Sequence, residues 1–390
     1  MSEWIPISAL PNLLLREPVG DGDIAVTPLS DYRIAAAVAE QPLIGEFLDR
    51  FTDAFGRPIL PSVLIIRQDV IEAYGNTSAM AGFRDLLAVA TIPNARAVYI
   101  THGGGMGAPV WSETFSIYPW MVDRHGKELV CQTPAMLGTH HVEEFRGQTD
   151  VGLPQHQVEI SRVDGPLFNE VLLRWHRRFR GDEASWEDRA LFRSLNMARA
   201  AMLMPGGVEF SFYDVGRLLT HWISAFEILL HPGPGGSVGE AQILDVLDSA
   251  IWLDRRCADL TTEVKIGKHR TARTAASGLC HRMYALRHDF LHGNDVRGEQ
   301  LVTNEVPFLI LASSLYRVVL ATVLNLRAPP IEDDADEEAI ARHIGNLIYW
   351  KDPQRRHEKA ILKAAGIKKI EGGEAPILNF DHVISRGCTP

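Results

Sequence analysis

A short stretch of the chain combines an arginine with two histidines at the end of an apolar segment. Residues 285–295 read ALRHDFLHGND, which places Arg287, His288 and His292 within six positions. A guanidinium is a planar, permanently charged fork that matches phosphate oxygens. Imidazole is the side chain that ordinarily titrates near neutral pH. These residue types therefore suit acid–base chemistry on a phosphate ester.

The residues before this stretch predict the helix that must position it, from about Thr274 to His292. Arg287 lies near the middle of the apolar face, where a guanidinium is costly to bury unless an anionic group meets it. Gly293 fits the C′ position that ends a helix. The apolar face is formed by Ala276, Leu279, Cys280, Met283, Leu286 and Phe290.

The end of this helix is suited to proton transfer. The partial negative charge at a helix C-terminus favours the imidazolium form of His292, and Arg287 supplies the positive charge that a phosphate needs there. The backbone at Gly293 leaves room for a substrate. Arg287 and His292 are separated by roughly 140° around the helix axis. A cleft between two helices, or a twofold dimer, would be needed to bring them together.

These residues resemble the R-x-x-x-x-H signature of HEPN ribonucleases, which commonly has a polar residue after the arginine and a glycine after the histidine. Arg287, His288, His292 and Gly293 fill those places. Upstream, LLTHWISAFEILL is similar to the Apea-like branch of the family, with Glu227 at its acidic position. The resemblance covers residues 166–327 and leaves the first 165 residues and the tail unexplained.

The resemblance implies a helical bundle that forms a homodimer through its motif helices. It also implies a metal-independent endoribonuclease, without a cofactor, that cleaves RNA by attack of the 2′-OH on the adjacent phosphate. His292 would be the general acid or base, and Arg287 would stabilise the charge of the transition state. His288 would position the substrate or assist proton transfer, and Glu227 could orient Arg287. Gly293 and Asn294 are supporting residues.

Such domains often serve in prokaryotic antiviral defence or as toxins, which implies a regulated activity in the cytoplasm. Other interpretations stay open. Arg287 could be a structural arginine paired with Glu227, and His292 could only cap the helix. His288 and His292 could bind a metal if a third ligand came from elsewhere. The whole unit could also be a non-catalytic HEPN module that dimerises and binds a partner.

The chain carries a formal net charge of −10, so RNA would have to be held by a local basic patch. The stretch KIGKHRTAR offers Lys265, Lys268, Arg270 and Arg273 as candidates for RNA binding. A second basic stretch, RWHRRFR at residues 174–180, fits the solvated face of an amphipathic helix better. The stretch HGGGMGA at residues 102–108 is interpreted as a glycine-rich loop, because no helix is expected to follow it.

The fold class predicted from these patterns is α+β, in three parts. Residues 1–165 form a mixed domain that could sense a trigger or restrain the nuclease, with helices at 32–55 (interrupted at Pro42) and 78–90. Strands are expected at 62–66, 95–100, 112–122 and 127–132. Residues 166–330 form the bundle, from helices only, including one at 239–253. Residues 331–390 form an acidic linker and an appendage with two short helical patterns.

Two features bear on localisation. Residues 306–326 are long enough to span a bilayer, but Arg317 near the middle, on one side with Ser314 and Asn325, indicates a buried helix of a bundle instead. The four cysteines form no CxxC pair, and the N-terminus lacks the apolar core of a signal peptide. The sequence therefore predicts a cytoplasmic protein with reduced thiols and no membrane span.

Overall fold

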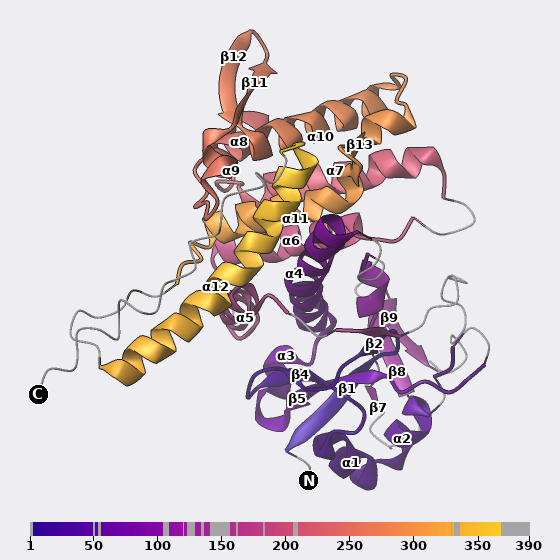
Figure 1. The fold of residues 1–390 in the computed structure, drawn as a ribbon. Coiled ribbons are helices and arrows are strands. Elements are labelled where there is room, and N and C mark those ends of the chain that lie inside the picture. The colour runs from indigo at the N-terminus through magenta and orange to yellow at the C-terminus, as the bar shows by residue number, and fades with distance from the viewer. Residues whose placement is uncertain are drawn as a thin grey trace, which may run out of the picture.

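The fold combines small sheets with a large helical region, so the α+β prediction is confirmed (Figure 1). The computed structural model describes residues 3–49, 51–53, 56–103, 109–119, 121–122, 129–133, 136–140, 157–160, 163–181, 184–205, 210–328, 330 and 336–367. For residue 119 and those between 121 and 140, it describes the backbone alone.

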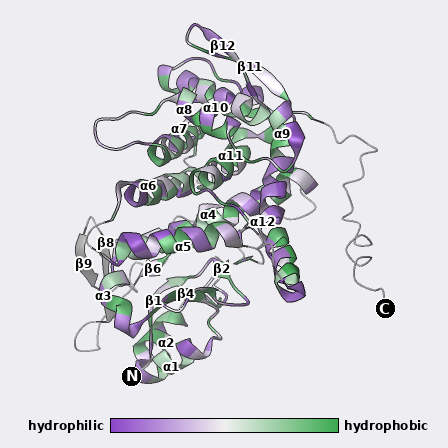
Figure 2. Cartoon of the chain, turned by 90° about the vertical axis from the view of Figure 1, so that its left-hand side faces the viewer, coloured by the Kyte–Doolittle hydropathy of each residue, from purple (hydrophilic) through white to green (hydrophobic). Residues whose placement is uncertain are grey.

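The largest sheet has the strand order β3-β4-β5-β1-β6, and all its neighbouring strands are antiparallel. Its central strands are continuous apolar runs because helices cover both faces (Figure 2). Val63 and Ile65 pack against α1 (Tyr32–Glu40) and α2 (Pro42–Leu48), whereas Leu64 and Ile66 face the larger core. The strands are β1 (Trp4–Leu10), β3 (Val19–Gly20), β4 (Ile24–Thr27), β5 (Ser62–Arg67) and β6 (Tyr118–Pro119).

The remaining strands form small sheets. Strand β2 (Leu13–Leu14) pairs with β10 (Val158–Glu159) in parallel. The antiparallel sheets are β7 (Met121–Val122), β8 (Leu129–Thr133) and β9 (Met136–His140); β11 (Thr261–Ile266) and β12 (His269–Thr274); and β13 (Val302–Thr303) and β14 (Val306–Pro307). The short helices are η1 (Gln68–Val70), α3 (Ile71–Tyr74), η3 (Ser112–Phe115), α9 (Arg255–Asp259) and η5 (Gly298–Leu301).

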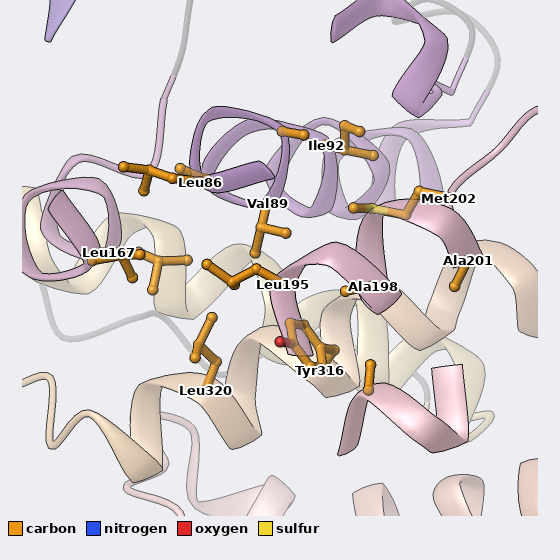
Figure 3. Close-up of a cluster of buried hydrophobic side chains, with 14 of the residues drawn as sticks. Leu86, Val89, Ile92, Leu167, Leu195, Ala198, Ala201, Met202, Tyr316 and Leu320 are labelled. Carbon is orange, nitrogen blue, oxygen red and sulfur yellow. The ribbon is translucent and has the colours of Figure 1, made fainter. Parts of the chain in front are cut away.

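The helical region packs around α4 (Thr77–His102), which is buried along most of its length and contacts α5, α6, α11 and α12. Figure 3 shows Leu86 and Val89 of α4 meeting Leu195 of α6, with Tyr316 and Leu320 of α11 on the other side. The other long helices are α5 (Gly165–Phe179), α6 (Trp186–Ala201), α7 (Phe212–Leu229), α8 (Glu240–Asp248), α10 (Ala275–His292), α11 (Phe308–Val323) and α12 (Glu337–Ala364).

The strand expected at residues 95–100 is wrong, because α4 continues through it. Its apolar, β-branched residues resemble a strand, and Pro93 suggests a break, but burial on several sides stabilises the helix. Near the proline, the backbone N–H of Asp164, from outside the helix, donates to the carbonyl of Ala90 at 2.7 Å. Helix α4 thus lies in the helical layer although it precedes residue 165, and the domain division there stays a prediction.

The prediction of helices only after residue 166 is also wrong, since β11 and β12 form a hairpin and β13 pairs with β14. The helix expected at 239–253 ends at Asp248, and residues 112–115 form a 3-10 helix. The two short patterns near the C-terminus are one helix, α12, whose second half packs against α4 and α11, so it is no appendage. Most of HGGGMGA (104–108), the acidic run 331–335 and the tail 368–390 lie outside the described residues.

Helix α11 is the buried bundle helix that the sequence predicts, with Arg317 inside the core. None of the helices in the described ranges combines the length and the apolar character that a bilayer crossing requires. Cys257 and Cys280 are buried free thiols, and burial raises the pKa of both. The side chains of the other two cysteines lie outside the described part of the chain.

Candidate active site at the end of α10

Helix α10 begins and ends close to where the sequence predicts. At its start, the Thr274 hydroxyl accepts from the backbone N–H of Ser277 at 3.3 Å. At its end, Gly293 adopts a left-handed φ of 72°, and its N–H donates to the carbonyl of Asp289. The side chain of Asn294 donates to the carboxylate of Asp289 at 2.8 Å, so the supporting role of Asn294 is to fix the end of the helix.

Helix α7 lies antiparallel beside α10. The Tyr284 hydroxyl donates to Glu227 at 3.2 Å, near the end of α7, while the ring of Phe290 packs against Gly216 near its start. A Cβ at Gly216 would lie 2.5 Å from the Phe290 ring, so only glycine permits this approach. Arg287, between Tyr284 and Phe290 on the same helix, is therefore placed toward α7.

The Arg287 guanidinium is half-buried and has no partner among the residues that the structure describes. Its Nε is buried without a hydrogen bond, and the described residues offer it no ion pair. Glu227 does not orient it as the resemblance suggests, because that carboxylate accepts from Tyr284 instead. An unsatisfied buried N–H costs about 1–3 kcal/mol, a cost that a bound anion would remove.

The two histidines are exposed and lie against each other. The ring centroids of His288 and His292 are 4.2 Å apart, with an angle of 43° between the planes. The Nδ1 of His288 lies 3.9 Å from the carboxylate of Asp289. Both rings are therefore open to solvent. No contact among the described residues brings His292 to Arg287 within one chain.

A metal centre finds no support in this part of the molecule. Two histidines on one helix leave at least one ligand to be supplied. Within the described ranges, no group of three or more His, Cys, Asp or Glu residues is placed to hold an ion. A metal held by His288 and His292 would need ligands from another molecule or from residues outside those ranges.

The basic stretch forms the hairpin of β11 and β12, which projects from the bundle (Figure 1). Its turn is Gly267 and Lys268, and Gly267 adopts a positive φ of 58°, as two-residue hairpin turns require. Lys265 and Arg270 face each other across the strands. These three basic side chains are exposed, and Arg270 alone has a carboxylate nearby, Glu263 at 3.5 Å.

Arg273, the fourth candidate for RNA binding, is used inside the molecule. Its guanidinium donates to Asp245 at 2.5 Å and to Asp248 at 2.8 Å, and 16% of the side chain is exposed. Asp248 also accepts from the hydroxyls of Thr274 and Ser277 at the start of α10. The hydrogen bond to Asp248 raises the pKa of Arg273. Arg273 therefore ties β12 to α8, and Asp248 ties α8 to the start of α10.

The hairpin and the histidines lie at opposite ends of α10. A helix of 18 residues is about 27 Å long, so one chain does not bring Lys265, Lys268 or Arg270 to His292. The other basic stretch, in α5, pairs internally: Arg174 and Arg177 both approach Asp188, and His176 contacts Asp21 and Tyr74. These contacts favour a structural role for that stretch.

Two further residues of this region, Tyr284 and His221, are not identified by the sequence patterns. Tyr284 holds Glu227, and burial first, then Glu227 itself, raises the pKa of its hydroxyl. His221 lies on α7 in the span that runs beside Arg287, and burial together with Arg217 lowers its pKa. A signal was present, since His221 interrupts an apolar helical pattern and Tyr284 lies one turn before Arg287.

The likeness to HEPN ribonucleases therefore rests on the residues of α7 and α10 and on their helical setting. The chain has also been compared with models of protein families, with curated proteins and with solved structures. None of these comparisons gives a match.

Proposed function

We propose that this chain is a metal-independent endoribonuclease of the HEPN type, acting through Arg287 and His292. The observation that carries the proposal is a half-buried guanidinium that has no carboxylate partner among the described residues, on a helix whose end exposes two imidazoles in contact with each other. A cation of this kind is stabilised when a phosphate fills the vacant hydrogen-bonding position. The exposed imidazoles supply the proton transfers that cleavage of a phosphodiester requires.

The reaction follows from these groups. A neutral His292 removes the proton of the ribose 2′-OH, and the oxygen attacks the adjacent phosphorus. The bond to the 5′-oxygen breaks, that oxygen takes up a proton, and a 2′,3′-cyclic phosphate remains. Arg287 neutralises the charge that builds up on the phosphoryl oxygens in the transition state. His288, whose ring lies against that of His292, positions the substrate or assists the return of the proton.

A homodimer completes this site in the proposal. Because Arg287 and His292 point to different sides of α10, a second copy must bring its own α10 alongside. Exposed apolar side chains surround the motif: Leu291 is 56% exposed and Tyr213 80%. Covering such side chains is what a second copy would provide. RNA is the proposed partner, and the exposed lysines of the hairpin would hold its backbone.

The biological setting is proposed from the resemblance alone: a cytoplasmic enzyme of prokaryotic defence, or a toxin-like one. The segment before residue 165 would sense a trigger or restrain the nuclease. Because α4 of this segment lies in the helical core, removing the whole segment would disrupt the bundle as well, and exposed substitutions outside α4 are the suitable test. If none of them changed RNA cleavage or its dependence on a trigger, this part of the proposal would fail.

The direct test compares wild type, Arg287→Ala and His292→Ala in cleavage of labelled RNA with EDTA present. Each substitution is expected to lower the rate by about 10²–10³-fold. Arg189→Ala and His343→Ala are matched controls, since both residues lie on other helices away from the motif. Mass spectrometry should find 2′,3′-cyclic phosphate ends. Equal rates for all five proteins would refute the mechanism.

The alternative is a non-catalytic HEPN module that dimerises and binds a partner. The separate directions of Arg287 and His292 on one chain favour this alternative, because a binding surface does not need them to meet. A stable dimer that binds RNA without cleaving it, in the presence of any required activator, would establish the binding module and exclude the nuclease.

A further inference from the structure

A pocket of about 270 Å³ lies between α11, α12 and the loop that follows α8. Its walls come from the second half of α11 with the residues after it, from Trp350, Lys351 and Gln354 of α12, and from Ser249, Ala250, Ile251 and Leu253 of the loop. The residues of the α10 motif do not line it. The pocket is therefore separate from the proposed nuclease site, and the inference below does not depend on that proposal.

The charge of this pocket is unlike that of the chain. Among the described residues that line it, the ionisable ones are Arg317, Arg327 and Lys351, and none is acidic. The whole chain has ten more acidic than basic residues. Three basic and no acidic side chains make the described wall of this pocket positive, which favours an anionic ligand.

Arg317 is the fixed part of this wall. It is 3% exposed, and its Nε donates to the Asp164 carboxylate at 2.8 Å. Its Nη1 donates to the Gln354 amide oxygen, and the Gln354 amide nitrogen donates to Glu358 at 3.0 Å. Glu358 accepts from the backbone N–H of Leu253 at 2.8 Å. The bottom of the pocket is therefore a connected polar network, held in place before any ligand arrives.

Two cations of the lining have no carboxylate partner. Asp164 balances Arg317, whereas Arg327 and Lys351 have no ion-pair partner among the residues that the structure describes. Glu358, behind Gln354, accepts from the backbone N–H groups of Leu253 and Asp254, and burial raises the pKa of its carboxyl. Two positive charges match the dianionic head of a phosphate monoester better than the single charge of a carboxylate. Arg327 is exposed and Lys351 half-buried, so both can adjust to an arriving head group.

The rest of the pocket is apolar. Val318 and Ala321 of α11, Leu326 after it, Ile251 of the loop and Trp350 of α12 give it surface for an organic group. Drug-sized ligands occupy about 300–1,000 Å³, so the occupant here is smaller. We propose that this pocket binds a small organic phosphate, with its phosphate at Arg327 and Lys351 and a single ring or short chain on the apolar wall.

The test is a titration of the full-length protein by calorimetry. The probes are phenyl phosphate and the ribonucleoside monophosphates, and the comparison ligands are inorganic phosphate and benzoate. The proposal expects at least one organic phosphate to bind more tightly than both comparison ligands. The double variant Arg327→Gln/Lys351→Gln should weaken that binding about tenfold or more. Arg317 is left intact, because its loss would unbalance Asp164 and disturb the fold.

Lys359→Gln is the matched control, since Lys359 is an exposed lysine of the same helix outside the pocket. It should bind like wild type, and melting temperatures should agree among all three proteins. The proposal is overturned if no organic phosphate binds at millimolar concentration, or if inorganic phosphate or benzoate binds as tightly as the best of them. It is equally overturned if the double variant binds as well as Lys359→Gln.

Discussion

Two arginines on apolar helix faces have opposite surroundings in this molecule. Arg317 of α11 is 3% exposed and meets Asp164 at 2.8 Å, inside a network that joins α5, α11 and α12. Arg287 of α10 is half-buried, and its Nε has no partner among the described residues. A buried charge is tolerated when it is paired and hydrogen-bonded. The contrast indicates that Arg317 serves the fold, whereas Arg287 is kept available for a ligand.

A third arginine shows another way to satisfy a buried guanidinium. Arg96 of α4 is fully buried and donates to the backbone carbonyls of Val110, Met202 and Leu309. Burial lowers its pKa to about 9. The Nε of Arg273 is also unbonded, but its guanidinium is paired with Asp245 and Asp248. What distinguishes Arg287 is that its guanidinium has neither a carboxylate nor a carbonyl partner among the described residues.

The largest expected effect on stability comes from removing Arg317. In Arg317→Met, Asp164 is left as a buried, unpaired carboxylate, and the free energy of unfolding should fall by about 3–5 kcal/mol. Urea denaturation followed by circular dichroism measures this loss. The double variant Asp164→Asn/Arg317→Met is the control, and it should recover part of the loss. A loss below about 1 kcal/mol would show that the pair behaves like an exposed one.

A smaller effect is expected from pH in the same network. His357 of α12 is fully buried, and burial first, then Arg317 and Arg356, hold its pKa well below the ordinary value. The folded state therefore keeps this imidazole neutral while the unfolded state takes up a proton below about pH 6.5. The contribution of His357 to the free energy of unfolding is therefore complete above that pH. It decreases as the pH falls, by at most about 1.4 kcal/mol per pH unit.

Urea midpoints at about pH 7.5 and about pH 5.5 test this expectation on either side of the ordinary histidine pKa. His357→Gln should show a shallower decline than wild type across that interval. His221, whose pKa is also lowered, contributes in the same direction to both proteins and cancels in the comparison. An identical decline in the two proteins would contradict the assignment to His357.

The sequence predicts some parts of this molecule well and others not at all, for physical reasons. Thr274 and Gly293 mark the ends of α10 because capping is local chemistry within a few residues. The sequence predicts a helix at residues 78–90 and a strand at 95–100, because the latter residues favour a strand locally. Packing by helices distant in sequence makes both segments part of one helix, α4. The hairpin at residues 261–274 was missed because its charged residues gave no clear alternation, although Gly267-Lys268 is a turn signal.

In the candidate site too, some features could be predicted from the sequence and others could not. That Arg287 and His292 point to different sides of α10 follows from helix geometry and could be predicted. The ion-pair partner of each charged side chain could not be predicted, because that partner comes from residues distant in sequence. Arg273 was expected to contact RNA but binds Asp245 and Asp248, and Glu227 was expected near Arg287 but accepts from Tyr284. Only tertiary packing decides which charges remain free.

The measurement that tests the central contrast most directly is a pair of assays on Arg287→Met, which keeps an apolar stem without the charge. Because no group among the described residues loses a partner and a buried unsatisfied N–H is removed, the free energy of unfolding should not fall below that of wild type by more than about 0.5 kcal/mol, while RNA cleavage in EDTA should be lost. Destabilisation comparable to that of Arg317→Met, or cleavage at the wild-type rate, would contradict the account that Arg287 is held for a phosphate.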